Sequence, residues 1–334
     1  MIEPDPSAPA VATGGSRWRW ALWLKVAVTL LLFGWIAQMT DFSALGSALR
    51  RLDLAVVGGA LALVLAQQVV LAWRWHRIVN WLGGRWSLAQ SLRWVFVGLF
   101  FNQALPTAVG GDAVRMWALH RHGLSKQVAI GSVAVERGSG LALLALMIGA
   151  AVALSPRSLG GPEVERALLG GVFFIVAILT TAMFADKWLT RWLPPRLAEA
   201  GDRFGVAMRS LFRTPRAVAE LVAGGGIATS LGLWAAVVLG RGLGLQFEAS
   251  VYVALVGGAI LLTLLPISLG GWGVREAGMV ALFGHLGAPP EPVVALSVLW
   301  GILPLVVALP GGAYFWLTHR RDIDGPAGAG PDPQ

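Results

Sequence analysis

The feature that most restricts the fold of this chain is a series of long apolar runs with almost no charge. A helix needs about 20 residues to cross the hydrocarbon core of a bilayer, and backbone in that core must be hydrogen-bonded internally. The alternating pattern of a transmembrane barrel does not occur in the sequence. We therefore expect an all-α, polytopic integral membrane protein. The runs lie near 20–39, 54–72, 92–106, 128–154, 167–185, 217–240, 250–266 and 292–317.

Composition supports this class and excludes others. Of 334 residues, 56% are hydrophobic and 13% are charged, whereas soluble domains carry about 25% charged residues. The absence of cysteine excludes disulfides, thiol catalysis and cysteine-ligated metals. His120 and His122 lack a third ligand at metal-binding spacing, and no nucleotide-binding or hydrolase motif occurs, so we expect no metal, no cofactor and no catalytic residue. The net charge of +8 is typical of cytoplasmic membrane surfaces beside anionic lipids, and we expect no nucleic-acid partner.

Two runs, 92–106 and 250–266, are too short for a full span and end in the same motif. The segment LPTAVGGDAVR begins at Leu105, and LPISLGGWGVR begins at Leu265. Both have the form L-P-x-x-x-G-G-x-x-V-R. Each residue of the first copy is therefore separated from its match in the second copy by the same number of residues. The proline removes a backbone donor and stops a helix. The glycine pair is expected to turn the chain at positive φ and to permit close approach of backbones. The residues concerned are Pro106, Gly110 and Gly111 in the first copy and Pro266, Gly270 and Gly271 in the second.

Basic residues indicate which loops face the cytoplasm. The stretches 73–93 and 115–126 carry arginine or lysine and no acid, so we expect both to be cytoplasmic. The first short run and its motif then enter and leave on that face. The segment 250–288 is expected to enter and leave from outside. We therefore predict two re-entrant helical hairpins that open to opposite sides. We also expect a bacterial inner (cell) membrane location, cytoplasmic termini, external loops at 40–53 and 157–166, and a cytoplasmic segment at 186–216 that could contain an interfacial helix.

The separation between the two motif copies also matches longer apolar runs of the first half to runs of the second half. The prediction is about six full spans plus two re-entrant hairpins, arranged as an inverted 4+4 repeat. The repeats would cover about 17–155 and 165–317 within one transmembrane domain, 17–321. The flanking segments 1–16 and 322–334 are rich in proline, glycine and alanine, and we expect both to be disordered. Broken helices at corresponding positions of inverted repeats are the best pointer to a transport site.

Several charged residues lie where charge is costly. Glu136 and Arg137 fall about nine residues into the 128–154 run, where a charged side chain costs about 3 kcal/mol on insertion scales. They either face a polar cavity or form a structural ion pair, for example Glu136 with Arg115. Arg115 is suited to contact a phosphate with two hydrogen bonds, but is equally read as a cytoplasmic anchor. Asp112 is positioned to cap the second half-helix, whose free amides would otherwise suit an anion.

The remaining candidates are polar residues in or beside the short runs. Asn102 either lines a cavity or bonds to a neighbouring helix. In the second copy, Arg275 corresponds to Arg115, and Glu276 follows it directly. Ser268 either donates to a headgroup or, more simply, caps the half-helix.

Three segments together resemble a known family. NQALPTAVGGDAVR, SVAVERGSG and LPISLGGWGVREAG are similar to signature segments of the lysylphosphatidylglycerol synthase transmembrane-region family, also called flippase-like or UPF0104 proteins. In full-length synthases, a membrane part of this kind is implicated in moving aminoacylated phospholipid between leaflets, and a separate domain makes the lipid. The resemblance implies a stand-alone flippase-like protein without the synthase domain. Its motif residues here are Asn102, Pro106, Gly110, Gly111, Asp112, Arg115, Glu136, Arg137, Pro266, Ser268, Gly270, Gly271, Arg275 and Glu276.

We therefore expect a protein that is not an enzyme and translocates a phospholipid or polyprenyl-linked lipid. Its partners would be membrane lipids with anionic or phosphate-bearing headgroups, with lipid-synthesis proteins as further candidates. One alternative is an ion- or proton-coupled solute transporter that uses Glu136 or Glu276 as proton carrier. Another is a membrane enzyme that uses Asp112 or Glu136 as a base on a lipid headgroup. The last alternative is that the protein is a scaffold of a lipid-synthesis complex.

Overall fold

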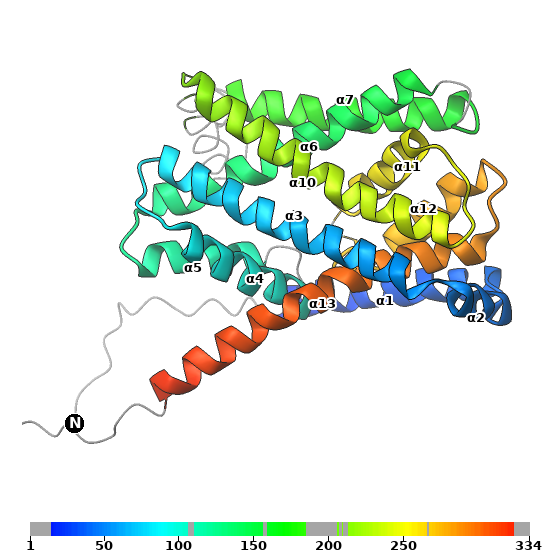
Figure 1. The fold of residues 1–334 in the computed structure, drawn as a ribbon, viewed down its shortest axis with the longest axis horizontal. Helices are drawn as coiled ribbons and strands as arrows, with labels where there is room; N and C mark the ends of the chain where they lie inside the picture. The colour runs from blue at the N-terminus through cyan, green and yellow to red at the C-terminus, as the bar shows by residue number, and fades with distance from the viewer. Residues whose placement is uncertain are drawn as a thin grey trace, which may run out of the picture.

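The computed structural model describes residues 15–105, 110–155, 159–184, 206, 209, 213–265 and 267–323. These residues form helices and contain no strand, and Figure 1 shows most of the helices running along one common direction. The helices are α1 (Gly15–Met39), α2 (Phe42–Arg51), α3 (Leu54–Trp81), α4 (Leu88–Ala104), α5 (Gly110–Arg121), α6 (Lys126–Leu154), α7 (Pro162–Phe184), α10 (Pro215–Gly242), α11 (Ala249–Leu262), α12 (Val274–Gly284) and α13 (Pro290–Ile323).

The long apolar runs of the sequence coincide with long helices. Five helices in the described part of the chain are long and apolar enough to cross a membrane, and the expected sixth span, α1, has a described apolar part, Trp23–Met39, that is shorter. Because every backbone group inside a helix is bonded within it, this architecture suits a lipid environment. The five are Leu54–Trp81, Lys126–Leu154, Pro162–Thr181, Pro215–Gly242 and Pro290–Thr318.

Short polar residues define where several helices begin. Asp53 accepts a hydrogen bond from the backbone of α3, and the Ser125 hydroxyl accepts one from Val128 in α6. Ser87 and Gln90 satisfy each other's backbone amides at the start of α4. Such caps satisfy amides that a helix leaves without partners, and they set the lengths of the connecting loops.

Two stretches expected as loops are helical. The segment 40–53 contains α2, which Asp41 caps by accepting from the amides of Ser43 and Ala44. The Ser43 hydroxyl and these amides lower the pKa of the Asp41 carboxyl below its ordinary value. The stretch 73–93, expected to be cytoplasmic, is helical up to Trp81, because a buried face of α3 continues beyond the apolar run, and helical again from Leu88, where α4 begins.

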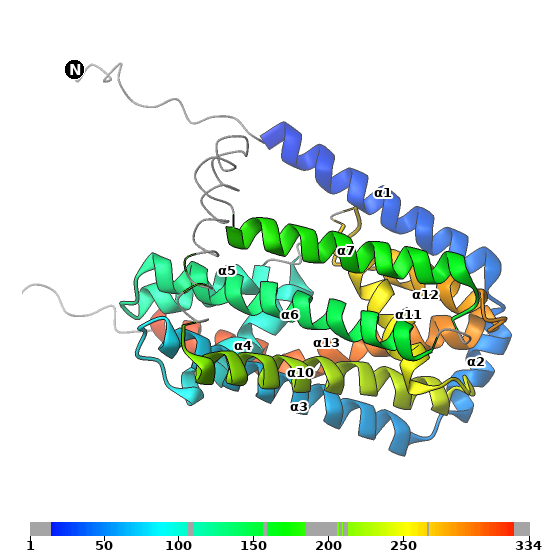
Figure 2. The same cartoon turned by 90° about the horizontal axis from the view of Figure 1, so that it is seen from above.

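The two short runs form antiparallel helix pairs with the helices that follow them. In the first, Gly98 of α4 lies against Gly111 and Arg115 of α5. In the second, Thr263 lies beside Gly271, and α11 continues against α12. The pair α4–α5 occupies one end of the bundle and α11–α12 the other, in both Figure 1 and Figure 2.

The helices of the two halves interleave. The most extensive packing is between α3 and α10, and around them α4 packs on α13 while α11 packs on α6. Figure 2 shows α3 and α10 side by side on one flank and α1 and α7 on the opposite flank.

The starts of corresponding helices repeat the spacing of the motifs. Helix α3 begins at Leu54 and its counterpart α10 at Pro215. Helix α4 begins at Leu88 and its counterpart α11 at Ala249. Both pairs of starts have the same separation along the chain, within one residue of the separation between the motifs. The equal spacing thus extends from the two motifs to the starts of the helices before them.

Candidate functional site

A cavity of about 400 Å³ lies between the hairpins and the long helices. Helices α3, α4, α5, α6, α10, α11 and α13 all contribute to its wall. More than half of the lining residues are leucine, valine, isoleucine, glycine, alanine or tryptophan, and the others are polar or charged. A cavity with both kinds of wall suits an amphiphilic ligand. The polar lining residues are Gln67, Gln68, Arg74, Asn102, Arg115, Glu136, Arg137 and Thr229.

Two adjacent residues of α6 hold two opposite charges of α5. Arg137 donates from Nε to one oxygen of Asp112 at 2.8 Å and from Nη2 to the other at 2.9 Å. Glu136 accepts a hydrogen bond from Nη2 of Arg115. Both acids and Arg115 are buried, whereas about half of the Arg137 side chain is exposed. The ion pair that the sequence offered as a structural reading of Glu136 is thus present, and it lies on the cavity wall.

Arg115 is further held by an aromatic ring and by a small residue. Its guanidinium carbon lies 4.3 Å from the ring centre of Trp75, a geometry in which the ring face attracts a cation. A Cβ atom at Gly98 would lie 3.0 Å from the Arg115 side chain, so glycine leaves the space that this side chain occupies. The Nε of Arg115 is buried and has no hydrogen-bond partner among the described residues.

Asn102, near the end of α4, is hydrogen-bonded to the start of α5. Its Oδ1 accepts from the amide of Gly111 at 2.8 Å, so this half-helix amide is occupied by the chain itself. Gly110 and Gly111 do not have positive φ, contrary to expectation. A Cβ at Gly111 would overlap the backbone of Gly98, so this glycine is needed for close helix approach. Pro106 lies outside the described residues.

The second motif does turn at positive φ. Gly270 and Gly271 have φ of 58° and 84°, and Gly273 follows with 83°. The amide of Gly273 donates to Glu276 at 2.6 Å, which caps α12. Ser268 does not cap this helix as expected, because α12 begins several residues later and Glu276 reaches back to its first amides.

The Ser268 hydroxyl is buried and has no partner among the described residues. Pro266 lies outside the part of the chain that the structure describes.

Arg275 is paired within its own helix. Its Nη2 lies 2.6 Å from Oε1 of Glu276, and Ser297 of α13 bonds to both side chains at 3.1 and 3.0 Å. The guanidinium carbon lies 4.7 Å from the ring centre of Trp272 and 5.6 Å from that of Trp300. Trp300 also lines the cavity, so this second cluster reaches the cavity through an indole.

The predicted residues thus divide into those on the cavity wall and those behind it. Asn102, Arg115, Glu136 and Arg137 line the cavity, and Asp112 supports them. Neither Arg275 nor Glu276 is among the lining residues.

Sequence reasoning missed Arg74, which it placed in a cytoplasmic loop. Arg74 is 3% exposed, lines the cavity and donates from Nη2 to Ser139 at 2.5 Å. The spacing of Gln67, Leu71 and Arg74 puts them on one face of a helix, and this periodicity could have revealed it.

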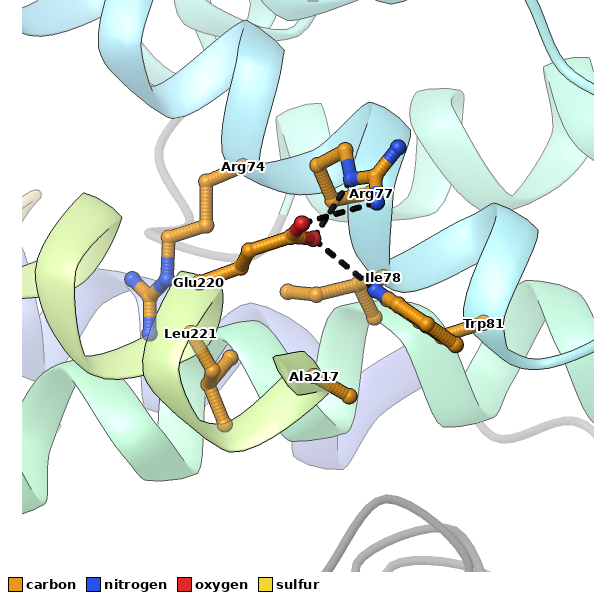
Figure 3. Close-up of a pocket in the computed structure, with 7 residues that line it drawn as sticks. All are labelled: Arg74, Arg77, Ile78, Trp81, Ala217, Glu220 and Leu221. Atoms are coloured by element: carbon orange, nitrogen blue, oxygen red, sulfur yellow. Dashed lines mark hydrogen bonds and ion pairs between the residues drawn. The ribbon is translucent and has the colours of Figure 1, made fainter. Parts of the chain in front are cut away.

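A second, smaller pocket lies beside Arg74 near the ends of α3 and α10. Glu220 of α10 accepts from Nε and Nη2 of Arg77 at 2.6 and 2.9 Å, and from the indole of Trp81 at 3.0 Å. Figure 3 shows these contacts converging on the Glu220 carboxylate, while the Arg74 guanidinium lies apart from them. These bonds join α3 to α10 at this end of the bundle.

Comparison with known proteins relates the chain to membrane proteins over most of its length. Residues 22–312 match the family described as the lysylphosphatidylglycerol synthase TM region. The chain is also 25% identical to a protein of Methanothermobacter thermautotrophicus described as a UPF0104 membrane protein, over 87% of this chain and 92% of that relative. With apolar helices of spanning length, these matches establish that this integral membrane protein belongs to the lysylphosphatidylglycerol synthase TM region family.

Proposed function

We propose that this protein translocates a lipid with a polar headgroup, a phospholipid or a polyprenyl-linked lipid, between the leaflets of the membrane without changing it covalently. The observation that carries the proposal is the cavity, which combines buried charged side chains with apolar walls. Charged residues within a membrane-embedded bundle mark pathways and sites, because burying them otherwise carries a cost. A headgroup would meet the charges while the acyl or prenyl chain follows the leucine-rich wall.

The proposed path depends on the two hairpins. The pairs α4–α5 and α11–α12 lie at opposite ends of the bundle, and both contribute to the cavity. We propose that each is re-entrant, so that the ends of the bundle face the two sides of the membrane. Non-helical backbone at such depth is tolerated where it is enclosed by protein or lines a wet cavity. The matching separation of helix starts and the exchanged packing of α4 on α13 and α11 on α6 support an inverted repeat.

The full arrangement would have six spans, with α1 as the sixth. The protein would lie in a bacterial inner membrane, with both termini on the cytoplasmic side. The family's name refers to a synthase of an aminoacylated phospholipid. That supports a lipid cargo for this chain, and proteins of lipid synthesis as partners.

Lipid exchange in sealed vesicles tests the proposal. The purified protein is reconstituted with fluorescent phospholipids or polyprenyl-linked lipids, and exchange is followed as the fraction of label accessible to an impermeant quencher. We expect exchange faster than in protein-free vesicles, with an unchanged lipid mass after the assay. Rates equal to protein-free vesicles for every headgroup contradict translocation, and a changed lipid mass points to an enzyme.

A pair of substitutions links the exchange to the cavity. Leu99 lines the cavity, and Leu309 is an exposed leucine of α13 that does not. Leu99→Trp adds the bulk of an indole within the cavity, so we expect it to slow exchange strongly. Leu309→Trp adds the same bulk elsewhere and is expected to leave the rate unchanged. Equal effects of the two substitutions on the exchange rate would show that lipid exchange does not depend on this cavity.

A further inference from the structure

We propose that the cavity binds one phosphodiester anion and that Arg74 is the residue that binds it. The inference rests on the proposed function, because it assigns the charge class of the headgroup that the cavity accepts. Arg74 projects from α3 and is nearly fully buried, yet it makes no ion pair among the described residues. Its recorded hydrogen bond goes to the neutral hydroxyl of Ser139, and its Nε has no partner in the described part of the chain.

The carboxylates around Arg74 are already taken by other cations. Glu136 accepts from Arg115, and Asp112 is bonded at both oxygens by Arg137. The cavity cluster therefore holds three guanidiniums against two carboxylates. A buried charge without a counter-charge is costly. A ligand with one negative charge would bring this cluster to neutrality.

Glu220, the acid across the smaller pocket, does not supply that charge. Its oxygens accept from Arg77, Trp81 and Arg216. In Figure 3 the carboxylate is turned toward Arg77 and Trp81, and the Arg74 guanidinium lies on the other side of the pocket with no bond to it. Arg74 thus borders both pockets, and only the larger one has room for a headgroup.

Two glycines on facing helices leave the guanidinium accessible. A Cβ at Gly225 of α10 would lie 2.9 Å from the guanidinium carbon of Arg74, and one at Gly140 of α6 would lie 3.7 Å from Nη1. A larger residue at either position would cover the group or displace it. Because Gly140 also lines the cavity, the guanidinium edge on that side faces cavity space.

The second half of the chain lacks an equivalent cation. There, Arg275 is neutralised one to one by Glu276. By the separation of the motifs Trp234 corresponds to Arg74, and by the separation of the helix starts Ala235 does, so neither alignment puts a cation there. The binding site is therefore a property of the first half alone, which gives the cavity one anion site. A guanidinium binds phosphate oxygens with paired, charge-assisted hydrogen bonds, and leucines of the same wall would contact an acyl chain.

Equilibrium binding to the purified full chain tests the site. Fluorescent phosphatidylglycerol, a phosphodiester lipid of net charge −1, is compared with phosphatidylcholine of the same acyl chains, whose net charge is zero. Inorganic phosphate and glycerophosphoglycerol serve as soluble competitors. Both lipids carry the phosphodiester, but the choline ammonium adds a positive charge to a cluster that already has one in excess, so the anionic lipid should bind the wild type about tenfold more tightly. A lipid site shows weak competition by either soluble ion, and a free-phosphate site shows displacement by inorganic phosphate alone.

Substitutions at Arg74 assign the effect to this residue. Arg74→Gln should remove the preference for the anionic lipid, and Arg74→Lys should keep part of it because the charge remains. Arg166→Gln removes the same charge from an exposed position of α7 and should leave binding unchanged. Melting temperatures establish that each variant is folded. If Arg74→Gln does not fold, equal binding of the two lipids by the wild type still overturns the site, and a reduced preference in Arg74→Lys still assigns the preference to this residue.

The two proposals fail separately. Equal binding of the two lipids by the wild type, or a preference that survives in folded Arg74→Gln, overturns the anion site even if vesicles show lipid exchange. An anion preference that depends on Arg74 supports the site even if no exchange is observed. In that case the proposed translocation fails and the binding site remains.

Discussion

Arg137 of α6 donates two hydrogen bonds to Asp112 of α5, of 2.8 and 2.9 Å, one to each carboxylate oxygen. The preceding residue, Glu136, accepts from Arg115 one turn further along α5. One short segment of α6 thus holds an acid and a base of α5, and this double contact orients α5 against the bundle.

The first prediction concerns the buried pair. Glu136→Gln removes the carboxylate that is hydrogen-bonded to Arg115 and leaves the buried guanidinium with only the more distant carboxylate of Asp112, at 3.7 Å. Removing one partner of a buried pair costs about 3 kcal/mol, so we expect a clearly lower melting temperature in detergent. Glu163→Gln, at an exposed position of α7, makes the same chemical change and should melt like the wild type. Equal melting of the two variants would show that the pair contributes little to stability.

The second prediction concerns the contact between α4 and α5. A methyl group at Gly111 would overlap the backbone of Gly98, which cannot rotate away as a side chain can. Gly111→Ala should therefore separate the two helices and cost about 3 kcal/mol of stability. Gly149→Ala, on α6, meets open space and serves as the control. A Gly111→Ala variant that melts with the control would contradict the close approach.

The third prediction uses two adjacent glycines of α10. Gly225→Ala would push against the Arg74 guanidinium and Leu143, whereas a methyl group at Gly226 meets nothing within 4 Å. We expect Gly225→Ala to weaken binding of the anionic lipid several-fold, because the cation is displaced. Gly226→Ala should keep that affinity and gain roughly 0.5 kcal/mol of helix stability. Titration of both variants with phosphatidylglycerol checks this, and identical affinities would argue against the position assigned to Arg74.

The fourth prediction concerns topology and uses the absence of native cysteine. Arg85 and Lys126 are exposed at the turns on either side of α4–α5, and Gln246 and His285 at the turns flanking α11–α12. Single cysteines at the first two positions should react with an impermeant maleimide only from the cytoplasmic face. Cysteines at the last two should react only from outside. A pair whose members react from opposite faces would identify a full crossing and exclude a re-entrant hairpin.

The positions of most long helices followed from the sequence. The runs 128–154 and 217–240 became α6 (Lys126–Leu154) and α10 (Pro215–Gly242) with small changes at their ends. Apolar composition over such lengths determines a helix, since a segment buried in lipid must satisfy its own backbone. The paired motif likewise marked two interruptions between helices, although only the glycines of the second copy turn the chain at positive φ.

Local patterns did not determine helix ends beyond the apolar runs. Hydropathy ended the apolar run at residue 72 and charge assigned 73–93 to the cytoplasmic side, yet α3 extends to Trp81 and buries Arg74. Its environment consists of Ser139 and glycines on two other helices, which are distant in sequence. Ser297, which binds Arg275, was missed for the same reason.

What the sequence determined by itself is the class of the protein, the approximate extent of its helices, the two breaks and the set of charged residues at them. Only the tertiary structure decided which charges are paired and which are not. Arg115 and Arg137 find carboxylates across a helix contact, and Arg275 finds one within its own helix. Arg74 finds none among the described residues. The physical reason is that insertion and helix formation depend on neighbours along the chain, whereas neutralising a buried charge depends on which helix faces meet in space.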